Sequence, residues 1–238
     1  MIKIGPYRMK KTVFYTEIAY FLALALLAIG TALTAYGGFG ISMVVAPAYL
    51  LHLKLSELFP AFTFGAAGYT LQAVVLLVMM LLLRKAKLIY LFSFVTAVFY
   101  SFLLDGAMLL TSLLPQTIFL QVSLYVAGAV LCCAAIAFLF TSYLPPEAYE
   151  LCVKEVSAKL GKPVHAVKTV YDCCSLAAAL LLSLLFFGTI RGIGIGTVAC
   201  AFLYGSLIRL FQKLYNNHFR FADRFPLRKY FEESEEAT

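Results

Sequence analysis

The chain has 238 residues, of which 63% are hydrophobic and only 13% are charged, and its mean hydropathy is +0.91. A soluble domain of this size has roughly a quarter of its residues charged, so the composition excludes one. The net charge of +7 would suit a nucleic-acid partner, but the charges lie in short segments between long apolar runs. We therefore predict an all-α membrane protein and expect no nucleic-acid binding.

Six apolar runs are long enough for a helix of about 20 residues to cross a bilayer. They cover 17–37, 61–83, 88–110, 117–141, 166–187 and 192–212. Helices are expected because lipid cannot satisfy open backbone groups, and the runs are too long for barrel strands. Of the 19 basic residues, all but Lys54 and Arg191 lie on one predicted side. The positive-inside rule then places both termini in the cytoplasm, and the first run is expected to be an uncleaved span.

Residues 42–54, SMVVAPAYLLHLK, align without a gap with residues 142–154, SYLPPEAYELCVK. Five positions are identical, where roughly one is expected by chance. The match predicts two repeats, 17–110 and 111–212, between an N-terminal segment 1–16 and a basic, then acidic tail 213–238. The third and sixth spans align after a slip of about five residues. The alternative to a duplication is that two unrelated connectors converged on a similar composition.

Repeats of three spans have opposite orientations in the membrane, as in many transporters. Each repeat has a connector, or elbow, after its first span. The outer elbow, 42–58, is apolar enough to re-enter the bilayer where protein or water surrounds it. The inner elbow, 145–160, is predicted to be an amphipathic helix on the inner membrane surface, with Glu147 and Glu150 complementing its positive end. Residues 213–231 are expected to rest on anionic lipid.

Ionisable groups inside spans are costly and therefore informative. Asp172 lies inside span 166–187, and the repeat pairs it with Gln72 of span 61–83. A buried carboxylate near a pseudo-two-fold axis can bind a cation or exchange a proton. Lys168 lies one turn earlier and can pair with Asp172. Simple neutralisation of Lys168 near the inner surface is the alternative interpretation.

Further candidate substrate- or ion-binding residues are Asp105, Tyr69, Tyr171, Gly40, Ser42, Gly194 and Gly196. Asp105 ends its span near the outer interface, where a carboxylate costs less, and the tyrosines flank the central polar positions. The glycines either break helices and expose backbone groups to a substrate or allow close helix packing at GxxxG spacing. The sequence contains no nucleophile triad, phosphate loop or metal-ligand spacing. We expect no enzyme activity, no cofactor and no bound metal.

Four segments carry a family resemblance: GGFGISMVVAPAYLL (37–51), PPEAYEL (145–151), KTVYDCC (168–174) and GIGIGT (192–197). They resemble the bacterial YczE/YitT-like integral membrane proteins over about residues 15–212. The resemblance implies a bacterial plasma-membrane location and a compact multi-span fold. It implies no particular substrate, mechanism or catalytic residue.

The first functional hypothesis is a small secondary transporter of a small solute or ion. It would work by alternating access, coupled to a proton or cation at Asp172. Its partners would be the lipid bilayer and an unidentified small solute, and the thin six-span bundle favours a homodimer. The rival hypothesis is a non-transporting accessory or regulatory scaffold. It would present residues 145–160 and the tail to a cytoplasmic partner.

Overall fold

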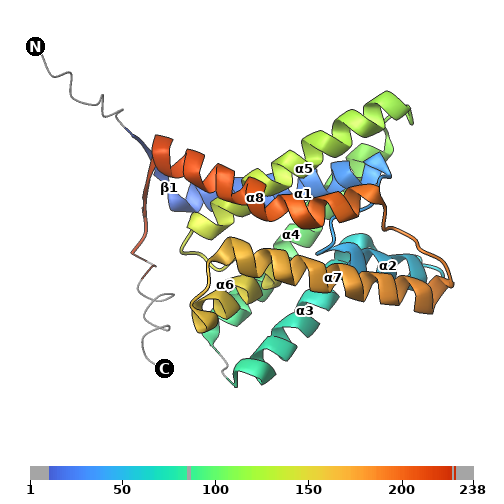
Figure 1. The fold of residues 1–238 in the computed structure, drawn as a ribbon, viewed down its shortest axis with the longest axis horizontal. Helices are drawn as coiled ribbons and strands as arrows, with labels where there is room; N and C mark the ends of the chain where they lie inside the picture. The colour runs from blue at the N-terminus through green and yellow to red at the C-terminus, as the bar shows by residue number, and fades with distance from the viewer. Residues whose placement is uncertain (1–10, 85–86, 227, 229–238) are drawn as a thin grey trace, which may run out of the picture.

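The structure is a computed structural model that describes residues 11–84, 87–226 and 228. In chain order its elements are β1 (Thr12–Tyr15), α1 (Thr16–Gly37), α2 (Ala46–Leu55), α3 (Phe64–Leu83), α4 (Leu88–Ser112), α5 (Ile118–Thr141), α6 (Ala148–Leu160), α7 (Val164–Phe187), α8 (Ile195–His218) and β2 (Phe219–Ala222). Six of these helices, all except α2 and α6, are long and apolar enough to cross a membrane (Figure 1). The prediction of a helical chain with six candidate spans is confirmed.

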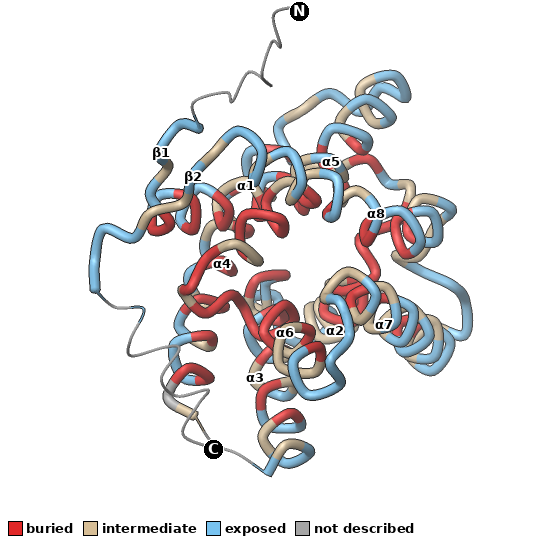
Figure 2. Tube along the Cα trace, turned by 60° about the vertical axis from the view of Figure 1, so that its left-hand side comes forward, coloured by how far each residue is buried: buried red, intermediate tan, exposed pale blue. Residues whose placement is uncertain are grey.

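The long helices expose apolar side chains on their outer faces. Leu81, Phe102 and Phe119 are 77%, 72% and 80% exposed. Figure 2 shows the buried residues gathered inside the bundle and the exposed ones around it. Soluble monomers rarely expose large contiguous apolar surfaces, so these faces suit contact with lipid. The fold is that of a multi-pass membrane protein.

Helices α1 and α5 make the most extensive contact between two helices of the bundle. Two glycines allow this close approach. A Cβ atom on Gly30 would lie 2.8 Å from the Gly128 carbonyl oxygen, and one on Gly128 would lie 2.6 Å from the Gly30 carbonyl oxygen. Small residues let membrane helices approach backbone to backbone. Any side chain at either position would push α1 and α5 apart.

The other helices complete a ring with this pair in a regular way. Helix α4 packs on α1 as α8 packs on α5, and α3 packs on α4 as α7 packs on α8. Each short helix contacts both α3 and α7. In Figure 1, α2 and α6 lie toward opposite ends of the bundle. The main contacts are therefore preserved when α1 to α4 exchange places with α5 to α8.

Helix α6 departs from the prediction of a surface helix. Its first half is buried, including Tyr149, Glu150 and Val153, because it packs against α3, α4 and α7. Only its last turn, 158–160, is exposed. The loop before it is also fixed, since the Pro146 carbonyl accepts a hydrogen bond of 2.6 Å from Ser93. The predicted surface position is wrong for the N-terminal half of this helix.

The sequence did not predict the two strands. Helix α8 continues to His218, beyond the predicted end of the last span, and β2 then pairs in parallel with β1, Thr12 opposite Phe219. Strands of four residues are too short to show a periodic pattern, and their partners come from opposite ends of the chain. Phe138 of α5 stacks on Tyr215 at 3.9 Å between ring centroids, beside the strands. Lipid contact by the rest of the tail stays a prediction.

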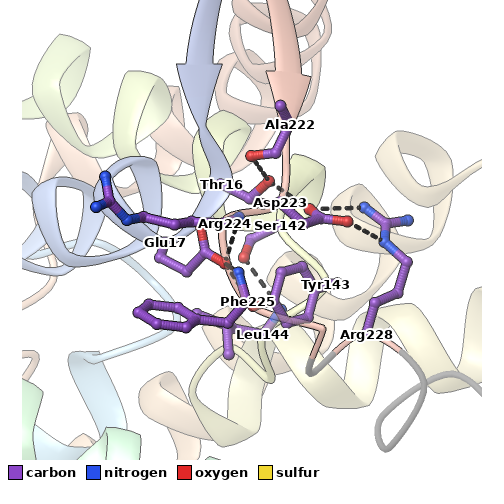
Figure 3. Close-up of polar contacts among 10 residues, drawn as sticks. All are labelled: Thr16, Glu17, Ser142, Tyr143, Leu144, Ala222, Asp223, Arg224, Phe225 and Arg228. Carbon is purple, nitrogen blue, oxygen red and sulfur yellow. Dashed lines mark hydrogen bonds and ion pairs between the residues drawn. The ribbon is translucent and has the colours of Figure 1, made fainter.

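Glu17 anchors the segment after β2 to the start of α1. Its carboxylate accepts hydrogen bonds from the backbone N–H groups of Arg224 and Phe225, both at 3.0 Å, and from the Tyr143 hydroxyl at 2.8 Å (Figure 3). A further ion pair joins Asp223 to Arg228 at 2.7 Å. These contacts hold the α5–α6 loop and the C-terminal segment together at one end of the bundle.

Candidate functional site: a buried polar centre

Five polar side chains gather where α3, α6 and α7 meet, and we call them the polar centre. They are Gln72 of α3, Glu147 just before α6, Glu150 of α6, and Lys168 and Asp172 of α7. Each is 2% exposed or less. Charged residues are rarely so buried unless they are paired, and their surroundings here are largely apolar. The centre is therefore the most unusual chemical feature of the described chain.

Gln72 joins the middle of α3 to the first turn of α6. Its amide nitrogen donates a hydrogen bond of 2.7 Å to Glu147 Oε2, and its amide oxygen accepts one of 2.9 Å from the backbone N–H of Ala148. Both ends of the buried amide are thus engaged, so it avoids the cost of unsatisfied polar groups. The contact fixes the position of the carboxylates of α6.

Lys168 connects α7 to the same helix. Its Nζ atom lies 2.9 Å from Asp172 Oδ1 and 3.5 Å from Glu150 Oε1. The pairing of Lys168 with Asp172, four residues later, is confirmed as predicted. Glu150 is a second partner that the sequence did not predict. Tyr171 packs beside the pair, with its ring centroid 5.8 Å from the ammonium nitrogen.

The polar centre contains three carboxyl groups and one ammonium group. Burial, reinforced by the charge of Glu150, raises the pKa of Glu147 well above its ordinary value. Burial disfavours the charged form of an acid, so Glu147 binds a proton more readily than an exposed glutamate does. With Glu147 neutral, two carboxylates still face one ammonium. The centre therefore has an excess of negative charge.

A cavity of about 20 Å³ lies beside the centre and accommodates about one water molecule. It lies against Tyr100, at the midpoint of α4, and against Thr31, Cys132 and Tyr204 of three further spans. The remaining polar lining comes from Ser42, Glu147, Tyr149, Glu150 and Lys168. The chain just before α2 and the first turn of α6 thus both reach the cavity.

Several polar atoms around this cavity have no hydrogen-bond partner among the described residues. They are Glu150 Oε2 and the hydroxyl groups of Tyr149 and Tyr204. Such atoms are rare in folded proteins, and each asks for an explanation. By contrast, the Tyr100 hydroxyl donates to Thr31 Oγ1 at 3.0 Å. Burial raises the pKa of Tyr149 well above its ordinary value, so its hydroxyl stays neutral.

The predicted glycines come together where the loop after α1 meets the loop before α8. The Ile41 N–H donates to the Gly192 carbonyl at 3.1 Å, and the Gly196 N–H donates to the Phe39 carbonyl at 3.0 Å. Gly40 has a φ of +105°, and a Cβ atom there would lie 2.4 Å from Gly194 N. Only glycine suits such a position. The two loops thus contact each other, and both line a second pocket of about 210 Å³.

GxxxG helix packing does not occur here, because residues 188–194 lie between α7 and α8. The glycines instead allow two loops to touch.

Two predicted site residues lie elsewhere. Asp105 accepts hydrogen bonds from Thr63 Oγ1 at 2.7 Å and from the Gly65 N–H at 2.9 Å, so it caps the start of α3. Tyr69 is 37% exposed and lines none of the cavities described here. Asp172 is fully buried and pairs with Lys168. Lys168 lines the cavity, whereas Asp172 does not.

Glu147 and Glu150 are the functional candidates that sequence reasoning missed. From sequence alone, both are expected to complement the dipole of a surface helix. A spacing of three residues places both on one helix face. Their counterparts under the repeat, Pro47 and Leu50, are apolar. That contrast was the signal that the acidic pair needed its own explanation.

The fold and the centre together define a multi-pass membrane protein with a buried charged site. Residues 14–213 match DUF6198, a family of unknown function, and the chain belongs to that family. No curated protein and no solved structure matches the chain.

Proposed function

We propose that the protein is a small secondary transporter that moves a small solute or ion by alternating access. The observation that carries this proposal is the polar cavity at the middle of the bundle, lined by Glu147, Glu150 and Lys168. Ionisable residues inside a membrane bundle usually mark substrate or ion pathways. Transporter sites lie near the midplane, where structural repeats meet.

The arrangement of helices supports two inverted repeats, 17–110 and 111–212, each with a short elbow helix. The main helix contacts are preserved when the two sets of four helices are exchanged. Gln72 and Asp172 occupy equivalent positions and are both fully buried. Tyr100 and Tyr204, related by the repeat offset plus a short slip, both line the cavity.

Contacts on both sides of the cavity support an occluded state of such a transporter. On one side, the loops around Gly40 and Gly194 are joined by two backbone hydrogen bonds. On the other, Gln72 holds the first turn of α6. Alternating access requires one of these closures to open while the other persists.

The wider setting belongs to the same proposal. The asymmetry of basic residues supports cytoplasmic termini, and the sequence resemblance supports kinship with YczE/YitT-like proteins and a bacterial plasma membrane. We infer a non-enzymatic protein that needs no cofactor and forms a homodimer in the bilayer.

The scaffold hypothesis keeps one specific observation in its favour. The cavity has room for about one water molecule, and Asp172 is sealed against Lys168 at 2.9 Å. A bundle that never opens would hold these charges only for structural reasons. The C-terminal segment docked on Glu17 would then be the functional surface.

A native cysteine can separate the two functions without knowledge of the substrate. Cys132 lines the cavity, whereas Cys133 is equally buried but does not. Two variants would each keep a single cysteine, Cys132 or Cys133, because the other free cysteines include the exposed Cys173 and Cys174. In membranes, a small membrane-impermeant thiol reagent should label the Cys132 variant slowly, because the cavity opens during alternating access.

The Cys133 variant is the matched control and should stay unlabelled under native conditions. Equal labelling of both variants would indicate general loosening of the bundle. If Cys132 stays unlabelled in the presence of every ion and metabolite of a broad panel, the transport hypothesis is rejected and the scaffold hypothesis is favoured.

A further inference from the structure

We propose that the central cavity binds one dehydrated monovalent cation, held by the carboxylate of Glu150 and the hydroxyl groups around it. The proposal deepens the transport function, because this cation would be the coupling ion. It rests on that function only for the ion's role in transport, and binding itself can be measured separately.

The first argument is the kind of atom that faces the cavity. Glu150 Oε2 and the hydroxyls of Tyr149 and Tyr204 are buried without a hydrogen-bond partner in the described chain. Thr31 Oγ1 lines the same space and already accepts one hydrogen bond, from Tyr100. Carboxylate and neutral oxygen atoms are the ligands that hard cations prefer. One bound cation would satisfy several otherwise unexplained atoms at once.

The thiols of Cys132 and Cys200 lie close to the Tyr204 hydroxyl, but neither makes a hydrogen bond of normal geometry with it. Sulfur is in any case a weak hydrogen-bond partner. The oxygen of Tyr204 therefore keeps its lone pairs for another ligand.

The second argument is charge. Lys168 lies 2.9 Å from Asp172 but 3.5 Å from Glu150, so its ammonium group is closer to the aspartate. Glu150 then carries the negative charge that no described cation fully balances. An unbalanced buried charge is strongly unfavourable. A single positive charge in the cavity would balance the centre, whereas an anion would worsen the excess.

The third argument is size and valence. A cavity of about 20 Å³ has room for an ion of roughly the size of one water molecule, stripped of its hydration shell. Among the described residues, no group of three or more His, Cys, Asp or Glu side chains is arranged to hold a metal ion. Divalent ions favour several carboxylates. One carboxylate surrounded by hydroxyls suits a monovalent ion such as Na⁺ or Li⁺.

The test uses the purified full-length protein in detergent. NaCl, LiCl or KCl replaces choline chloride at constant chloride concentration, and the melting temperature is followed. At least one alkali ion should raise it in a saturable way, because a ligand that binds only the folded state stabilises that state. Isothermal titration with the same salt gives the affinity directly.

Two variants assign the effect to the cavity. Glu150→Gln should weaken alkali-ion affinity by about tenfold or more, because it removes the only charged ligand. Its matched control is Glu155→Gln on the same helix, whose carboxylate pairs with Lys87 at 3.2 Å outside the cavity. Should Glu150→Gln fail to fold, Tyr204→Phe removes one ligand oxygen and keeps the buried ring. Tyr90→Phe, a buried tyrosine that does not line the cavity, is its control.

The outcomes separate this inference from the proposed function. The site is supported if Glu150→Gln abolishes alkali-ion binding and Glu155→Gln does not. This result does not depend on whether Cys132 becomes accessible. No stabilisation by any alkali ion overturns it, even if Cys132 labelling supports transport. Stabilisation by acid and by no alkali ion would place the balancing proton on a carboxyl group of the centre, either Glu150 itself or Glu147 or Asp172 beside it, and not on Tyr149 or Lys168, which are already protonated; this result would also overturn the inference.

Discussion

The pair of helices α2 and α3 and the pair α6 and α7 occupy equivalent places in the fold but differ in chemistry. The residues at matching positions are Pro47 and Glu147, Leu50 and Glu150, Gly68 and Lys168, and Gln72 and Asp172. All four positions of the first pair are buried, as are those of the second. The first pair shows that this packing forms without buried charges. The charges of the second pair therefore call for an explanation other than folding.

The contacts of the two short helices make the same point. Leu50 of α2 packs with Ala46 and with Ala179 of α7 in a small apolar cluster. The matching residue of α6, Glu150, instead faces Lys168 at 3.5 Å. Replacing a buried ion pair by apolar residues is often neutral or stabilising. The first pair of helices is an example of that replacement within the same molecule.

The largest effect is expected when the polar centre of the charged pair of helices loses its single ammonium group. Lys168→Met should destabilise the protein by about 3–5 kcal/mol, because Asp172 and Glu150 are left buried without a partner. The exposed pair of Lys54, in the last turn of α2, and Glu57 is the control. Lys54→Met should change the free energy of unfolding by less than about 0.5 kcal/mol.

Unfolding in mixed detergent and denaturant would measure both variants. The double variant Lys168→Met with Asp172→Asn should recover part of the loss, because it removes one uncompensated charge. Equal stability of Lys168→Met and the natural protein would show that the centre is hydrated and not sealed.

A smaller effect is expected at the residue that joins the two pairs of helices. Gln72→Ala should cost about 1–3 kcal/mol, because Glu147 and the Ala148 N–H lose their buried partner. Gln116→Ala, in an exposed loop, is the matched control. Hydrogen exchange should then increase in the first turn of α6 and not in α2. Uniform loosening of both short helices would contradict the role given to Gln72.

The comparison also shows which features of the fold and the site could be predicted from the sequence. Span positions followed from hydropathy, because bilayer thickness dictates helix length, and the i,i+4 pairing of Lys168 with Asp172 followed from helix geometry. The burial of Glu147 did not follow, since an acidic turn after two prolines reads equally well as a solvated helix start. Its surroundings come from α3 and α7, distant in sequence. The pairing of β1 with β2 was hidden for the same reason.

A third prediction concerns the pH dependence of stability. The pKa of Glu147 is raised by burial, so the folded state keeps a proton that the unfolded state loses. Stability should therefore fall as pH rises from the ordinary glutamate pKa toward the raised one. Glu147→Gln, which is neutral throughout, should lose less stability over this interval. Parallel melting curves for both proteins from pH 4 to 8 would contradict the assignment.

The smallest effect, with the opposite sign, is expected at the exposed ion pair of Asp223 and Arg228. The hydrogen bond from Arg228 holds the pKa of Asp223 below its ordinary value, so this pair stabilises the fold above the ordinary aspartate pKa. The contribution disappears as pH falls through the lowered pKa. Arg228→Gln should cost less than about 1 kcal/mol near neutral pH and nothing in strong acid. Melting curves of Glu147→Gln and Arg228→Gln, each compared with the natural protein, should thus diverge at neutral pH in opposite directions. This contrast arises because burial favours the neutral form of one carboxyl group, whereas an arginine favours the charged form of the other.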